Sequence, residues 1–291
     1  MAVYKRTFKV YRGRLTPAWS RFLVLTRYGY STLFQSRPFT AFTVLSLVPF
    51  LVAVGIVYLV HNAAVQTLLN VRMEQTLPID NMFFLRFLGI EAWMGFVLTA
   101  WSAPGMVSKD FTNDSIQLYL SRPFSRAEYL LGKISVLGGL LSLVTWIPGL
   151  LIFLVQAQME GHGWGWDHLW LAGAIVLSAL LWIALVSLLA MAISVWVRWR
   201  IAATALLIAI ILFLPAFSAV INAVLRTKWG FLLNYSFDII VVWSHLFRTY
   251  ERHLRPDAVP VWAAWMVLLS TFAFCLWLLN RRLKAREVVS A

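Results

Sequence analysis

The sequence contains few of the charged residues and almost none of the cysteine on which many soluble and secreted proteins depend. Only 13% of its 291 residues are charged, whereas about a quarter of the residues are charged in an average soluble domain. Cys275 is the only cysteine, which excludes a disulfide within the chain. The composition is therefore not that of an ordinary soluble domain.

Catalytic motifs are absent as well. The phosphate-binding pattern G-x-x-x-x-G-K-[ST] does not occur, because Ile134 follows Gly132-Lys133 and Ala127 stands where the first glycine would be. H-E-x-x-H and G-x-S-x-G are also missing. We expect no catalytic residue, no cofactor and no ATP hydrolysis in this chain. Any uphill transport would then draw its energy from a partner or from an ion gradient.

The sequence instead contains long runs of apolar residues. Hydrophobic residues make up 61% of the chain, and a membrane-crossing helix needs about 20 of them in sequence. The predicted spans are 39–60, 83–104, 130–156, 169–196, 201–224 and 261–280. A further apolar stretch near 231–247 carries Asn234, Asp238 and His245, so we expect a re-entrant or interfacial segment there, within an external segment 225–260. The sequence thus predicts an all-α membrane protein with a single six-helix transmembrane domain over residues 1–291.

The distribution of Lys and Arg along the chain predicts its orientation in the membrane. If the N-terminus is cytoplasmic, 18 of the 25 Lys and Arg residues lie on the cytoplasmic side, in 1–38, in 105–129 and its flanks, beside residue 200 and in the tail 281–291. Both termini are therefore predicted to be cytoplasmic. Anionic inner-leaflet lipids account for the net charge of +13. No compact basic domain is present to hold a duplex, so nucleic acid is not an expected partner.

The basic segment 1–38 contains an amphipathic pattern over 17–36. Trp19, Phe22, Leu23, Tyr30, Leu33 and Phe34 share one side of the helical wheel, although Val24 and Leu25 blur the division. A helix lying in the inner membrane interface fits this pattern. It could be a connecting helix next to a partner or a plain lipid anchor.

The polar connection 105–129 between the second and third spans has an ordered local pattern. Asn113 or Asp114 can cap a short helix over 113–121, and Pro123 would stop it. Ser125 and Glu128 then form a capping box directly before the third span. Taken alone, the connection could be an ordinary basic loop that follows the charge rule.

The block from Lys109 to Lys133, KDFTNDSIQLYLSRPFSRAEYLLGK, resembles the cytoplasmic loop of ABC-2 type permeases. The matching residues are Asp110, Ile116, Leu118, Tyr119, Leu120, Ser121, Arg122, Pro123, Ser125, Arg126, Glu128, Tyr129, Leu131, Gly132 and Lys133. The resemblance implies an exporter-like permease of the bacterial inner membrane, paired with a second permease subunit as a homodimer. It also implies two copies of an ATP-binding subunit, which would hold ATP and Mg, contact with membrane lipids, and a periplasmic partner as a further candidate.

The resemblance assigns the coupling role to the helix at 113–121. Ile116 and Tyr119 are expected to fill a groove on the ATP-binding subunit, and Arg122 and Arg126 to meet its carboxylates. Pro123 and Glu128 complete the expected coupling set by ending this helix and starting the next span.

Glu91 is the clearest ionisable residue inside a predicted span. It could line a translocation path or a subunit seam, or it could pair with Arg86 or with an arginine of 225–260. Asp238 and His245 are separated by seven residues, which would place them on one helix face beside an outer gate. The turn 161–168 contains two His and one Asp among glycines, but no fourth ligand, so no metal site is expected.

Two other classes of function remain open from the sequence. An ion-coupled secondary transporter would need several acidic residues near the bilayer midplane, whereas Glu91 is a single acid in the outer half of its span and the two halves show no repeat. A non-transporting scaffold or mechanotransmission subunit would carry a large external domain, for which no loop is long enough.

Overall fold

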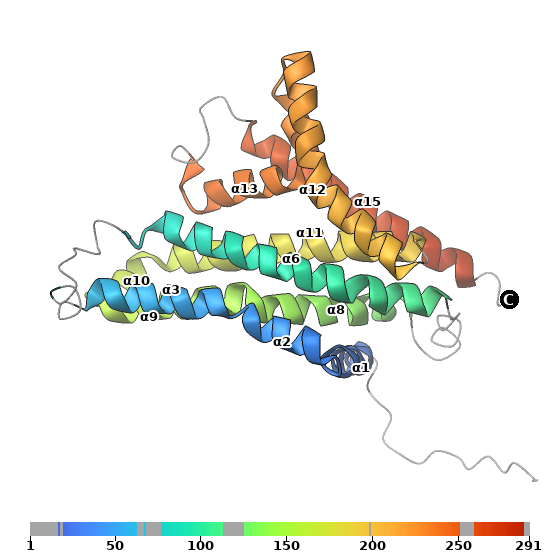
Figure 1. The fold of residues 1–291 in the computed structure, drawn as a ribbon, viewed down its shortest axis with the longest axis horizontal. Coiled ribbons are helices and arrows are strands. Elements are labelled where there is room, and N and C mark those ends of the chain that lie inside the picture. The colour runs from blue at the N-terminus through green and yellow to red at the C-terminus, as the bar shows by residue number, and fades with distance from the viewer. Residues whose placement is uncertain are drawn as a thin grey trace, which may run out of the picture.

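The computed structural model describes residues 17, 20–62, 67, 77–112, 125–197, 199–250 and 259–287. Every regular element in these ranges is a helix (Figure 1). The elements are α1 (Phe22–Phe34), α2 (Arg37–Leu45), α3 (Val48–His61), α6 (Asn81–Thr112), α8 (Arg126–Val144), α9 (Trp146–Glu160), α10 (Trp164–Asp167), α11 (Leu169–Trp196), α12 (Arg200–Leu225), η2 (Trp229–Leu233), α13 (Tyr235–Leu246) and α15 (Val261–Glu287).

Six helical segments of the described chain are long and apolar enough to cross a membrane. They are Arg37–His61, Asn81–Ser108, Ala127–Glu160, Leu169–Trp196, Arg200–Leu225 and Val261–Arg282. The prediction of an all-α protein with six span-length helices is therefore confirmed. We call the end of the bundle at which α6 ends and α8 begins the loop end.

Two of these six segments are broken helices, and a proline explains each break. Pro49 has no N–H to donate to the carbonyl of Leu45, and Pro148 has none for the carbonyl of Val144. Leu45 and Val144 are the last residues of α2 and α8. The chain restarts as α3 and α9, with Pro49 and Pro148 in their first turns.

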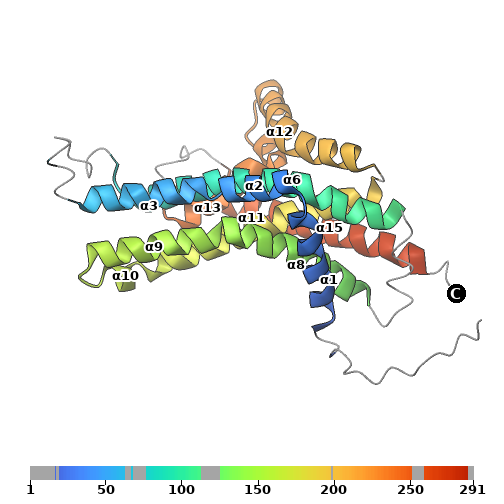
Figure 2. The ribbon, with the colours of Figure 1, turned by 60° about the horizontal axis from the view of Figure 1, so that its bottom comes forward.

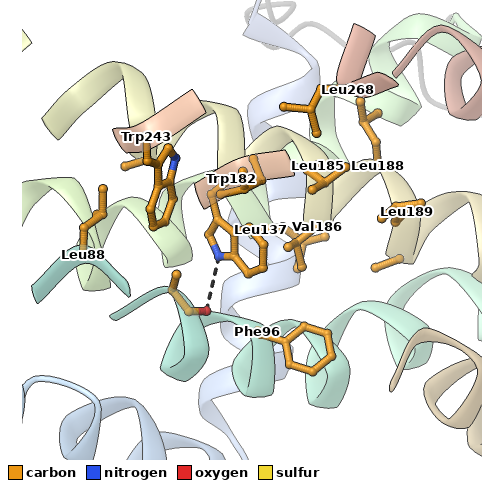
Figure 3. Packing of buried hydrophobic residues seen from close by; sticks show 14 of the residues in the cluster. Leu88, Phe96, Leu137, Trp182, Leu185, Val186, Leu188, Leu189, Trp243 and Leu268 are labelled. Carbon is orange, nitrogen blue, oxygen red and sulfur yellow. Dashed lines mark hydrogen bonds between the residues drawn. The ribbon is translucent and has the colours of Figure 1, made fainter. Parts of the chain in front are cut away.

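The helix α11 forms the centre of the bundle. In its most apolar window 67% of the residues are buried, against 17% for α12. Trp182 of α11 donates through Nε1 to the carbonyl of Ala92 on α6, 3.2 Å away (Figure 3). Trp243 of α13 donates to the carbonyl of Ser178 on α11 at 2.9 Å. Because lipid tails are as apolar as leucine, such packing and hydrogen bonds, rather than hydrophobicity, hold these helices together.

The first helix lies across the bundle instead of along it. Figure 2 shows α1 running at a steep angle to α6, α8 and α11. Leu25, Thr26 and Gly29 are its buried residues. Leu23 and Phe34, on the apolar side of the helical wheel, are exposed. The side of α1 that contacts the bundle therefore differs from the apolar side that the sequence assigned to the membrane interface.

The segment after α12 contains a short helix packed into the protein. The 12 residues of α13 extend over about 18 Å at 1.5 Å per residue, which is too short for a hydrocarbon core of about 30 Å. Asn234 caps it by accepting the N–H of Phe237 at 3.2 Å. The second half of α12 projects away from the bundle (Figure 1), and Phe213, Phe217 and Val224 on it are exposed.

Candidate functional site

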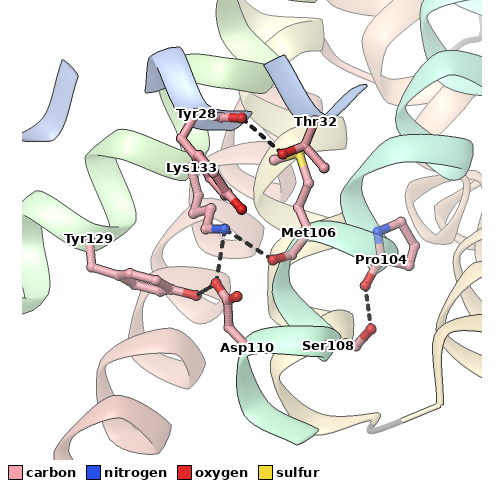
Figure 4. Close-up of polar contacts among 8 residues, drawn as sticks. All are labelled: Tyr28, Thr32, Pro104, Met106, Ser108, Asp110, Tyr129 and Lys133. Atoms are coloured by element: carbon pink, nitrogen blue, oxygen red, sulfur yellow. Dashed lines mark hydrogen bonds and ion pairs between the residues drawn. The ribbon is translucent and has the colours of Figure 1, made fainter. Parts of the chain in front are cut away.

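Charged and polar side chains join the last turn of α6 to the first turns of α8. Lys133 of α8 forms an ion pair with Asp110 of α6, with 2.9 Å between Nζ and Oδ2. The hydroxyl of Tyr129 donates to the same Oδ2 at 2.9 Å, and Lys133 also donates to the carbonyl of Met106 at 3.1 Å. Figure 4 shows the three side chains converging. We call Asp110, Tyr129 and Lys133 the loop-base cluster.

The start of α8 is fixed by its own sequence. Glu128 Oε2 accepts the backbone N–H of Ser125 at 2.6 Å, and Ser125 Oγ accepts that of Glu128 at 3.2 Å. The capping box predicted from the sequence is therefore confirmed. Tyr129 and Lys133 follow one turn apart, so both reach the same side of α8. This side faces α6.

Glycines let α1 approach the beginning of α8. A Cβ added at Gly132 would lie 2.9 Å from Leu25 Cβ and 3.1 Å from the carbonyl oxygen of Phe22, and one at Gly139 would collide with the hydroxyl of Tyr30. The hydroxyl of Thr26 donates to the carbonyl of Gly132 at 3.2 Å. That of Tyr30 donates to the carbonyl of Ser135 at 3.3 Å. Burial raises the pKa of Tyr30 above its ordinary value, which keeps this donor protonated.

The end of α6 is also bonded to α12. Pro104 lies inside α6 and cannot donate to the carbonyl of Ala100. The hydroxyl of Thr204 on α12 donates to that carbonyl instead, at 3.3 Å. Arg200 donates to the carbonyl of Trp101 at 3.1 Å. The neighbouring helix α12 thus supplies a hydrogen-bond partner for the carbonyl that the proline inside α6 leaves free.

A cavity of about 520 Å³ opens beside the loop-base cluster. Its polar lining includes Tyr28, Thr32, Asp110, Lys133 and Arg200, contributed by α1, α6, α8 and α12. All four helices therefore meet at the loop end.

Most of the predicted coupling residues fall outside the part of the chain that the structure describes. These are Ile116, Tyr119, Arg122 and Pro123. Arg126 is the first residue of α8, without a described side chain, and Glu128 belongs to the capping box. The structure therefore describes the two flanks of the predicted coupling helix but not the helix itself.

Glu91 is fully buried in α6, and among the described residues neither carboxylate oxygen has a hydrogen-bond partner. The pairing with Arg86 is not present, and Arg86 is exposed. Phe87 and Gly95 lie one turn to either side of Glu91, and both positions approach the junction of α8 and α9, at Gly149 and at Leu141. Glu91 therefore lies on the side of α6 that faces this broken helix.

Asp238 and His245 lie in different surroundings despite their spacing. Asp238 is buried in the first turn of α13, and its carboxylate also has no hydrogen-bond partner in the described part of the chain. Burial raises the pKa of Asp238 to about 8. His245 is exposed and lines a cavity of about 890 Å³ together with Asp80, Arg248 and Tyr250. The structure does not bring the two side chains to one site.

The glycine-rich turn is organised by ring stacking. His168 stacks on Trp164 with 4.3 Å between ring centroids, and its Nδ1 lies 2.9 Å from the carbonyl of Trp164. Within the described ranges, no three His, Cys, Asp or Glu side chains come together as metal ligands would.

No protein-family model and no curated protein matches this chain in sequence comparisons. The arrangement at the loop end therefore has to be interpreted from its own chemistry. The sequence block already contained all three residues of the loop-base cluster. The spacing of Tyr129 and Lys133 was the signal that both would face one neighbour.

Proposed function

We propose that this chain is the permease subunit of an ABC-2 type transporter, which moves a substrate across the membrane with energy from a separate ATP-binding subunit. The observation that carries the proposal is the loop-base cluster. It ties the last turn of α6 to the first turns of α8, on both sides of the loop that resembles an ATPase-docking segment. A force on that loop would therefore reach two membrane helices together.

The surrounding contacts support the transfer of such a force. α1 packs on α8 through Gly132 and Thr26, and Arg200 and Thr204 join α12 to α6. Movement of the loop would then displace α1, α6, α8 and α12 together. Interfaces that are packed and hydrogen-bonded change state as units rather than deforming gradually.

The proposed assembly contains two permease chains and two ATP-binding subunits in a bacterial inner membrane, with the loop end in the cytoplasm and export as the direction. The exposed apolar side chains on the projecting second half of α12, Phe213, Phe217 and Val224, provide surface for the second permease chain. The loop end carries the basic connection, which agrees with a cytoplasmic location.

A pull-down from the native cells tests this function. Tagged protein, extracted in a mild detergent, is expected to carry a P-loop ATPase that mass spectrometry identifies. Changing Tyr119 and Arg122 to Ala is expected to remove the ATPase without loss of the folded permease. Gly138→Ala is a suitable control, because the space around Gly138 is open. Absence of any ATPase from several detergents contradicts the proposal.

The second candidate is an ion-coupled carrier, which the buried carboxylates of Glu91 and Asp238 favour. Both lack partners among the described residues, and intramembrane acids of this kind often carry protons in transporters. This candidate requires that Glu91→Gln abolish uptake or efflux driven by a pH gradient in liposomes that contain the chain alone.

A further inference from the structure

An apolar groove of about 790 Å³ lies between α11, α12 and α15. Its walls include Ile193, Leu206, Ile210, Phe274 and Leu278. Leu206 and Phe274 are exposed at its rim, so the groove opens on the surface that faces lipid. No described helix fills it.

The groove has a cationic end. Trp196 lines it there, and the guanidinium of Arg282 lies over the Trp196 ring at 5.3 Å from the centroid. Arg282 follows Leu278 by one helical turn and therefore continues the same side of α15. Its Nε is buried and, among the described residues, has no hydrogen-bond partner. A guanidinium group presents donors in a planar fork that matches the oxygens of a phosphate.

The length of the groove matches one leaflet of a bilayer. Ser270 lines its inner end, and Arg282 lies about 18 Å farther along α15 at 1.5 Å per residue. Half of a hydrocarbon core of about 30 Å is about 15 Å. The groove thus reaches from near the bilayer midplane to the headgroup level at the loop end.

We propose that this groove binds one anionic phospholipid of the leaflet at the loop end, with an acyl chain along α15 and the phosphate on Arg282. The apolar walls fit the chain, and Arg282 adds a charge of the right sign at the depth of the headgroup. A zwitterionic lipid would fill the same groove but gain less from Arg282. This site does not depend on the proposed ATP-driven function, because it involves neither the coupling loop nor the loop-base cluster.

Native mass spectrometry of the full chain tests the site. The protein is stripped of lipid in detergent and titrated with phosphatidylglycerol or phosphatidylcholine. We expect one tightly retained phosphatidylglycerol, preferred over phosphatidylcholine roughly fivefold, since one basic residue near a membrane surface contributes a factor of this order. Arg282→Gln should remove the preference.

Arg281→Gln is the matched control. Arg281 is adjacent, carries the same charge and lies over Trp277, at 5.2 Å from its ring, instead of over the groove residue Trp196. The Arg281→Gln variant should keep the preference for phosphatidylglycerol over phosphatidylcholine. Equal losses in both variants would mean general attraction to the headgroup layer and would overturn the proposal.

Ser270→Trp tests the apolar part, because Ser270 is exposed at the inner end of the groove and can be enlarged without entering the core. Binding of both lipids should fall. Unchanged lipid binding with a lower fraction of dimer would mean that the groove is a contact between two chains, which overturns the proposal.

Discussion

The carboxylate at the loop end has hydrogen-bond partners, whereas the two carboxylates in the interior of the bundle have none among the described residues. At the loop end, Asp110 accepts from Lys133 and from Tyr129, each at 2.9 Å. In the interior, Glu91 and Asp238 are fully buried and, in the described part of the chain, make no hydrogen bond through their carboxylates. A buried carboxylate is tolerated when it is paired, and otherwise when it keeps its proton. The loop end therefore pairs its carboxylate with a cation, whereas the two interior carboxylates have no partner among the described residues.

The largest expected effect on stability comes from removing the cation that pairs with Asp110, which leaves this carboxylate without an ion-pair partner, like Glu91 and Asp238. Lys133→Met removes the cation but leaves Asp110 with only 15% of its side chain exposed. We expect a loss of about 3 kcal/mol, as for other ion pairs broken from one side. Thermal unfolding in detergent would measure it.

The double variant Lys133→Met with Asp110→Asn is the control for this change, because it removes both charges. It should recover more than half of the lost stability. Equal stability of the single and double variants would show that the ion pair does not matter for folding.

Two adjacent glycines on α8 offer a sharp comparison for the contact with α1. A Cβ at Gly139 meets the hydroxyl of Tyr30, whereas a Cβ at Gly138 meets nothing within 4 Å. Gly139→Ala should destabilise the protein by about 1–3 kcal/mol through overpacking. Gly138→Ala should stabilise it by up to about 1 kcal/mol through helix propensity.

Tyr30→Phe should rescue most of the loss in Gly139→Ala, since it removes the colliding atom. Unfolding temperatures of the three variants provide the comparison. If Gly138→Ala and Gly139→Ala behave alike, the close packing of α1 on α8 is incorrect.

The unpaired acid of α13 predicts a dependence on pH. An aspartate in the unfolded chain has a pKa of about 3.9, whereas that of Asp238 is about 8. Between these values the folded protein holds a proton that the unfolded chain has released, so stability falls as the pH rises. Asp238→Asn should therefore be increasingly more stable than the wild type from pH 5 to pH 8, with no further gain above pH 8.

Unfolding temperatures of both proteins at a series of pH values would measure this difference. The wild type at each pH is the reference for the variant. A difference that stays constant across the range would show that Asp238 does not hold its proton.

The smallest expected effect concerns the proline inside α6. Thr204→Val removes the hydroxyl that bonds to the carbonyl of Ala100 and should cost about 0.5–1.5 kcal/mol. In a Pro104→Ala background the same change should cost less, because the introduced alanine would supply its own N–H to that carbonyl. Equal costs in the two backgrounds, measured by a double-mutant cycle, would contradict the role given to Thr204.

The helices of this fold could be predicted because each is a long apolar run, and the capping box because it is local in sequence. The breaks at Leu47 and Thr145 could also have been found, since each precedes a proline that cannot bond to the residue four positions earlier. The ion pair between Asp110 and Lys133 could not be predicted, because its partners lie on different helices and their approach depends on packing.

The surroundings of Glu91 could not be predicted either, because they also depend on how the helices pack. The sequence marked Glu91 as costly and offered Arg86 as a partner, but five residues along a helix place two side chains on different faces. The face of α1 that contacts the bundle could not be predicted, for a related reason. A helical wheel measures hydrophobicity, whereas α1 packs through glycine and hydrogen bonds, as at Gly29 and Thr26.

The ATPase rate of the purified complex tests the central claim, that the loop end receives the force of an ATP-binding subunit. The rate is compared between the wild type, a variant with Tyr119 and Arg122 changed to Ala, and Gly138→Ala, all reconstituted with the co-purifying ATPase. We predict that the wild type and Gly138→Ala stimulate hydrolysis, and that the loop variant, still folded, does not. Unchanged stimulation by the folded loop variant would contradict the claim.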